Sequence, residues 1–109
     1  MLNGRGIKLN IKEAQKEIHG IAVSKGWYAN SALNLPEALC LIHSELSEAL
    51  EKYRMGYDPS GPVIATELAD VIIRTLDLAE YLNIDMEDII RKKMDYNKTR
   101  RYRHGNMRC

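Results

Sequence analysis

The sequence lacks the features that mark disulfide-bonded, zinc-binding or membrane-spanning proteins. Its 109 residues include only two cysteines, Cys40 and Cys109, which lie far apart and belong to no CxxC or Cys/His cluster. A disulfide framework and a zinc site are therefore not expected. No run approaches the roughly 18 to 20 apolar residues of a membrane span, and the first residues have no apolar signal-peptide core. We expect a soluble, cytoplasmic protein.

Strand patterns are absent as well, since no segment alternates polar and apolar residues with period two. Apolar residues instead recur every three to four positions and predict helices over about 11–24, 36–55 and 62–82, with a fourth helix after Asp85. With 45% apolar and 28% charged residues, the chain can form a core. We expect one all-α domain over residues 1–109, a compact four-helix bundle. Because such a bundle is thin, an oligomer would help to bury its apolar area.

Short local signals mark the helix ends. Asn10 with Glu13, and Asp85 with Asp88, have the spacing of a capping box at a helix N-terminus. Proline suits the first turn of a helix, which fits the second and third predicted helices. The segment 56–62 holds two glycines and two prolines and is predicted to be a loop.

The small net charge of +1 hides a segregation of charge sign. Residues 91–109 carry eight basic side chains and one acid, a net charge of +7, whereas residues 1–90 carry eight basic and fourteen acidic side chains, a net charge of −6. In the basic segment Lys93 and Asn97 lie one helical turn apart and Arg100 follows, a set suited to binding phosphates. The alternative is a basic tail that binds nucleic acid non-specifically or keeps the protein soluble.

Two pairs of acids have helical spacing. Glu45 and Glu48 are three residues apart in the second predicted helix, and Glu67 and Asp70 are three apart in the third. Each pair lies on one side of its helix, so antiparallel packing would bring four carboxylates together. The helix over 62–82 is apolar around most of its circumference, so we expect it to be buried and its acids to occupy a partly dehydrated groove.

Several acids in such a groove remain ionised together when a cation neutralises them. Carboxylates without clustered histidines favour Mg²⁺, or Mn²⁺, over zinc. A di-iron bundle would need Glu-x-x-His motifs, and the sequence has none. The alternative needs no metal, because the acids can form solvated helix faces and Arg74 can pair locally with Asp70 and Asp77.

The single tryptophan, Trp27, follows Gly26 just after the first predicted helix. Its ring could stack on a base at that position, or it could plug the core. His19 lies about two turns earlier and on its own is an ordinary surface or core histidine.

Three motifs follow one another along the chain: Glu45-Leu-Ser-Glu48, then after eighteen residues Glu67-Leu-Ala-Asp70, then Lys93-Met-Asp-Tyr-Asn97. In this order they resemble the MazG-like family of all-α nucleoside triphosphate pyrophosphohydrolases. The resemblance covers about residues 10–105, including Lys25-Gly26-Trp27 and the closing Arg101-Tyr102-Arg103-His104-Gly105.

The resemblance implies an all-α NTP pyrophosphatase fold that assembles as a homodimer or homotetramer and holds Mg²⁺ at the four acids. It implies hydrolysis of a (d)NTP to the monophosphate and pyrophosphate, as in house-cleaning enzymes that act on dNTPs or non-standard nucleotides. It further implies that Lys93, Asn97 and Arg100 bind the phosphates and that His19 and Trp27 line the base pocket.

The mechanism expected from these assignments is attack of a metal-activated water on the α-phosphorus. Either Glu45 or Glu48 would orient the water as a base, while the acids as a group hold the metal. The competing hypothesis is a noncatalytic nucleic-acid-binding or antitoxin-like helical module that contacts phosphates through residues 91–109.

Overall fold

The computed structural model describes residues 9–29 and 33–100 and contains four helices there. They are α1 (Ile11–Ser24), α2 (Leu35–Arg54), α3 (Pro62–Tyr81) and α4 (Met86–Lys98). The first three agree with the predicted ranges to within one residue, and the described residues contain no strand, so the all-α, four-helix prediction is confirmed. None of these helices is long and apolar enough to cross a membrane. The predicted closing motif over 101–105 lies outside the described residues.

Side-chain caps fix where the helices begin. The Asn10 carboxamide oxygen accepts a hydrogen bond from the Glu13 backbone N–H at 2.8 Å, and the Asp85 carboxylate accepts one from the Asp88 N–H at 3.1 Å. Both predicted caps are confirmed. Helix α2 is capped by Asn34, whose side chain accepts from the backbone N–H three residues later at 3.0 Å, a cap that the sequence analysis did not identify.

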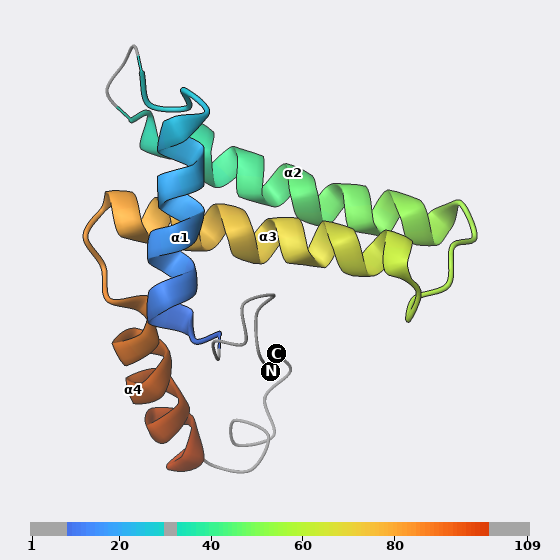
Figure 1. Cartoon of the computed structure of the whole chain (residues 1–109). Helices are drawn as coiled ribbons and strands as arrows, with labels where there is room; N and C mark the ends of the chain where they lie inside the picture. Colours follow the sequence, from blue (N-terminus) through green and yellow to red (C-terminus); the bar gives the residue numbers. More distant parts are fainter. Residues whose placement is uncertain (1–8, 30–32, 101–109) are drawn as a thin grey trace.

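Helices α2 and α3 form an antiparallel hairpin, which α1 crosses near the end where α2 begins and α3 ends (Figure 1). Helix α4 packs against α1. The predicted loop over 56–62 is the turn of the hairpin, and Gly56 adopts φ +98° there, a left-handed conformation that glycine accepts without strain. The end of the hairpin that carries this turn extends beyond the part that α1 crosses (Figure 1).

The apolar core lies mainly along α3 where α1 and α2 meet it. Among the described residues its buried apolar members are Ala14, Ala49, Ile64, Leu76, Leu78 and Ala79. The prediction that the helix over 62–82 is buried is met only in part, because Leu68 is 45% exposed and Ile72 is 59% exposed. Helices α1 and α2 cover two sides of α3, and no other helix of the described residues covers its remaining side.

A buried amide joins α1 to the end of α3. The Gln15 side chain is almost fully buried, and its nitrogen donates to the Glu80 carboxylate at 3.0 Å and to the Ile84 carbonyl at 2.7 Å. The second of these bonds ties α1 to the turn that leads into α4. Gln15 therefore fixes how α1 crosses the hairpin.

We expect Gln15→Ala to lower the free energy of unfolding by about 1–3 kcal/mol, since it leaves two partly buried acceptors without their donor and removes a buried side chain. Urea denaturation followed by circular dichroism measures the change. Lys16→Ala, at the next and exposed position of α1, is the control and should have little effect. Equal stability of the Gln15 variant and the wild type would contradict this role.

Candidate metal centre

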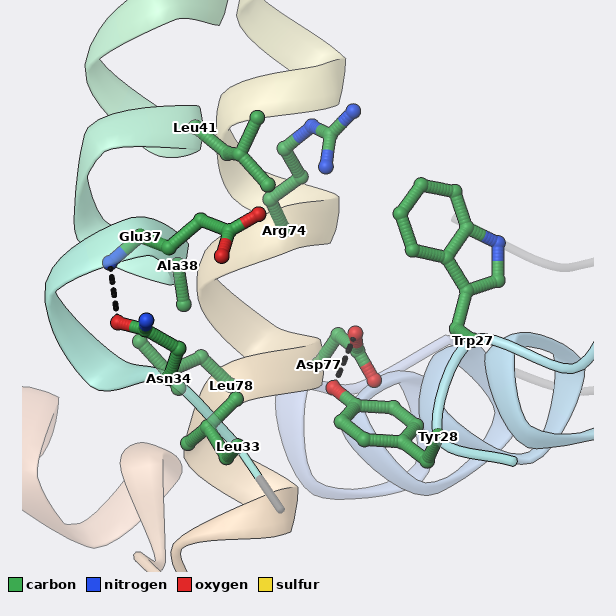
Figure 2. A pocket seen from close by; sticks show the side chains of 10 residues that line it. All are labelled: Trp27, Tyr28, Leu33, Asn34, Glu37, Ala38, Leu41, Arg74, Asp77 and Leu78. Carbon is green, nitrogen blue, oxygen red and sulfur yellow. Dashed lines mark hydrogen bonds between the residues drawn. The ribbon is translucent and has the colours of Figure 1, made fainter. Parts of the chain in front are cut away.

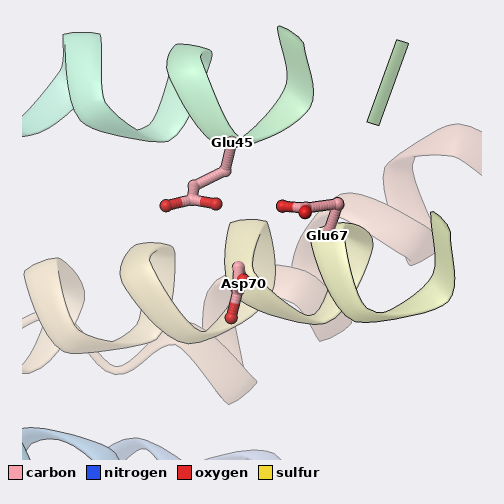
Figure 3. Close-up of side chains that lie close together, drawn as sticks. All are labelled: Glu45, Glu67 and Asp70. Atoms are coloured by element: carbon pink, nitrogen blue, oxygen red, sulfur yellow. The ribbon is translucent and has the colours of Figure 1, made fainter. Parts of the chain in front are cut away.

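The hairpin brings acids from α2 and α3 together. Carboxylate oxygens of Glu45, Glu67 and Asp70 lie within 4.8 Å of one another (Figure 3). Glu45 comes from α2 and reaches toward α3, which carries the other two acids one turn apart. Glu45 is buried, and Glu67 and Asp70 are partly buried. The spacing of three residues within each helix and the antiparallel packing together produce this cluster.

Glu48, the fourth predicted acid, lies beside Glu67 but is exposed and outside the closest three. The pKa of Glu67 is raised, first because its carboxyl is partly withdrawn from water and then because Glu48 is a hydrogen-bond partner and a negative charge. The charges of Glu45 and Asp70 raise it further. We call these four residues the acidic cluster. Its negatively charged members repel one another, and a bound cation would reduce this repulsion.

Among the described residues, Arg74 is the basic residue that forms an ion pair with the acidic cluster. Its Nε donates to the Glu45 carboxylate at 2.7 Å. The local pairs of Arg74 with Asp70 and Asp77 that the sequence suggested are not those that form. Asp77 instead accepts hydrogen bonds from other elements, and the long arginine side chain reaches across to α2.

Two adjoining cavities lie beside the acidic cluster and share Trp27, Arg74 and Asp77 in their walls. One, of about 270 Å³, also contacts Glu45 and Asp70. The other, of about 200 Å³, extends toward the start of α2 (Figure 2). Trp27 is 63% exposed, so the alternative of a core plug is wrong for this chain. The guanidinium carbon of Arg74 lies 5.5 Å from the centre of the indole ring.

A hydrogen-bonded group joins α1, α3 and the segment after α1 through Asp77. One Asp77 oxygen lies 2.7 Å from His19 Nδ1, and the other accepts a hydrogen bond from the Tyr28 hydroxyl at 2.7 Å. Burial and the Asp77 carboxylate raise the pKa of Tyr28 well above its ordinary value, so its hydroxyl remains a donor. The His19 ring also packs at 5.0 Å from that of Tyr28.

His19, expected in the base pocket, is thus outside the walls of both cavities and contacts them through Asp77. Sequence reasoning identified neither Tyr28 nor Asp77 as a functional candidate. Asp77 could have been found, because it lies on the same polar stripe of α3, one turn beyond Arg74 and two turns beyond Asp70.

The predicted phosphate-binding residues lie on or just after α4, which packs on α1. Lys93 and Arg100 both contact the ring of Tyr96, at 4.9 and 5.9 Å from its centre. Asn97 lies between them in the sequence, in the last turn of α4. Within the described residues, no hydrogen bond or ion pair joins this set to the acidic cluster. One chain alone therefore does not bring the two halves of the predicted site together.

The acidic cluster fits a hard divalent cation. One carboxylate oxygen of Glu67 is buried without a hydrogen-bond partner among the described residues, although buried polar atoms are nearly always paired. Clustered carboxylate oxygens without histidine or cysteine are the donor set that Mg²⁺ and Mn²⁺ accept. Glu45, Glu67 and Asp70 are the residues that would hold the ion.

No protein-family model, curated protein or solved structure matches this chain.

Removing one charge from the acidic cluster should stabilise the metal-free protein. We expect Glu67→Gln to raise the melting temperature by a few degrees in EDTA near neutral pH, because the carboxylate it removes is repelled by three others. The raised pKa means that the folded state binds this proton more tightly than the unfolded state. The wild type therefore loses stability relative to the variant as the pH rises, and the difference vanishes toward about pH 4.

Differential scanning calorimetry across this pH range measures the difference. Glu51→Gln is the matched control, since Glu51 lies on α2 and pairs with Arg54 rather than with the acidic cluster. A Glu67→Gln protein that melts below the wild type in EDTA would contradict the repulsion described above.

Proposed function

We propose that the protein is a Mg²⁺-dependent nucleoside triphosphate pyrophosphohydrolase that converts a (d)NTP to the monophosphate and pyrophosphate. The observation that carries this proposal is that two acids of the acidic cluster, Glu45 and Asp70, line a cavity that Trp27 and Arg74 also line. Such a cavity offers carboxylates for metal, cations for phosphate and an exposed ring for a base. The order of the three motifs, which resembles that of MazG-like enzymes, supports the reaction type.

The acids divide into two roles. Glu45, Glu67 and Asp70 hold Mg²⁺, which when bound lowers the pKa of a water and offsets charge on the phosphates. Glu48 lies outside this group of three but next to Glu67, and its exposed carboxylate would accept a proton from the attacking water. Of the two possible bases in the first motif, we assign Glu48, because Glu45 would be occupied as a ligand of the metal.

The nucleotide is oriented by groups in the wall of the same cavity. The exposed Trp27 ring stacks on the base, and the Asp77 carboxylate, held by Tyr28 and His19, offers an acceptor nearby. Lys25 and Arg74 are the cations of this cavity, and both suit phosphate oxygens. Lys93, Asn97 and Arg100 add further phosphate contacts if α4 of a second copy, or a movement of α4, brings them near.

Exposed apolar stripes on the hairpin support assembly into a homodimer or homotetramer. On α2, Leu46, Leu50 and Tyr53 repeat at helical spacing and are exposed, and on α3 Leu68 and Ile72 do the same. A second copy of the chain presents the same stripes, so a two-fold contact would bury the same apolar surface on each of the two copies.

Sedimentation-velocity centrifugation tests this assembly. We expect the wild type to sediment as a dimer or tetramer and Leu50→Glu to shift the equilibrium toward the monomer, because a charge would be buried in the contact. Val23→Glu, at an exposed apolar position of α1 outside both stripes and outside α4, is the control and should leave the assembly unchanged. A wild type that stays monomeric at micromolar concentration would contradict the proposed assembly.

Incubation with Mg²⁺ and a panel of NTPs and dNTPs, with identification of the released products, tests the activity. We expect pyrophosphate and the monophosphate from at least one nucleotide. Glu48→Gln and Asp70→Asn should each lower kcat by about 100-fold or more, the usual cost of losing a general base or a metal ligand. Circular dichroism should show unchanged helicity.

Glu51→Gln, one turn further along α2, is the matched control and should retain activity. Release of orthophosphate would indicate a different phosphohydrolase.

The separation of the α4 basic residues from the acidic cluster favours the alternative of a nucleic-acid-binding module. DNA binding that weakens steeply with salt, without turnover of any nucleotide, would support that alternative and overturn the enzyme.

A further inference from the structure

Arg74 links the two helices that carry the acidic cluster. Its Nε–H bond to the Glu45 carboxylate joins α3 to α2, and the Glu45 side chain is only 10% exposed while that of Arg74 is 30% exposed. A charged hydrogen bond of this length in a partly buried place is stronger than one in open solvent. The Arg74 guanidinium is therefore fixed beside the acidic cluster by its bond to Glu45.

Arg74 and a divalent ion would compete for one carboxylate. Glu45 is at once the partner of Arg74 and one of the three acids whose oxygens lie within 4.8 Å of one another. Among the described residues, no other lysine or arginine forms an ion pair with the acidic cluster. A divalent ion beside Glu45 would repel the guanidinium and take over its neutralising role.

The same guanidinium also contacts the indole of Trp27, with 5.5 Å between the Arg74 Cζ atom and the ring centre. Both residues line the two cavities, so a change in the position of Arg74 alters the surroundings of the indole. Trp27 is the only tryptophan in the chain, and its fluorescence therefore reports this contact without a background from other indoles.

We propose that Arg74 is an internal counter-ion that a divalent metal displaces from Glu45, and that its released guanidinium becomes a donor for anionic oxygens in the cavity beside Trp27. The inference rests on the metal site of the proposed function. It adds that the metal and the anion-binding group are coupled, because one carboxylate holds either the metal or Arg74. The cavity thereby gains its planar, two-pronged cation when the metal is in place.

Titration of the metal-free protein with Mg²⁺ alone tests the coupling, by calorimetry and by Trp27 fluorescence in parallel. For the wild type we expect a saturable change in fluorescence whose midpoint matches the calorimetric Kd. For Arg74→Gln we expect about fivefold tighter binding, because the competing ion pair is gone, and loss of the fluorescence change. Arg54→Gln, which removes the same charge at the far end of α2, should behave as the wild type.

Glu45→Gln identifies the site of binding, since it should lower the Mg²⁺ affinity. If Glu45-dependent binding is present but the Arg74→Gln protein keeps both the wild-type Kd and the fluorescence change, the displacement of Arg74 is wrong and the metal site stands. If Mg²⁺ does not bind in a Glu45-dependent way, the proposed function and the inference both fail.

Discussion

Electrostatic repulsion between carboxylates on facing helices opposes the packing of the α2–α3 hairpin. The α2–α3 hairpin gains stability from apolar packing along α3, yet the same packing forces Glu45, Glu67 and Asp70 together. One arginine offsets part of that cost. A fold that concentrates negative charge in this way is poorly stabilised at that point without a cation, and catalytic and binding sites are often built at such points.

The walls of the cavities are completed by elements that carry none of these acids. Helix α1 crosses the hairpin and is fixed by Gln15, and the segment after α1 places Trp27 and Tyr28 against α3. Asp77 joins both elements, because it binds His19 of α1 and Tyr28 of the following segment. The acids and the aromatic residues Trp27 and Tyr28 are therefore positioned by separate contacts, and both sets of contacts involve α3.

Local signals in the sequence were sufficient for the helices but not for the partners of long side chains. Asn10 and Asp85 cap the residues three positions on, so their roles depend on neighbours that the sequence displays directly. Arg74 has acids at local spacing but pairs with Glu45, twenty-nine residues away, because helix packing decides which acid its guanidinium reaches. Helix packing also decides the bond between His19 and Asp77, which the sequence does not predict. It likewise places Lys93 on α4, away from the acidic cluster of the same chain, although the sequence motifs predict that the two lie together.

The turn over residues 55–61 gives the hairpin a further property. All four acids lie within residues 45–70, on two helices joined by this one short turn. An ion held by Glu45 of α2 and by Asp70 of α3 would cross-link two segments that are close in the chain as well as in space. Its binding free energy would then add directly to the stability of the hairpin, so that a chelator would act as a denaturant directed at α2 and α3.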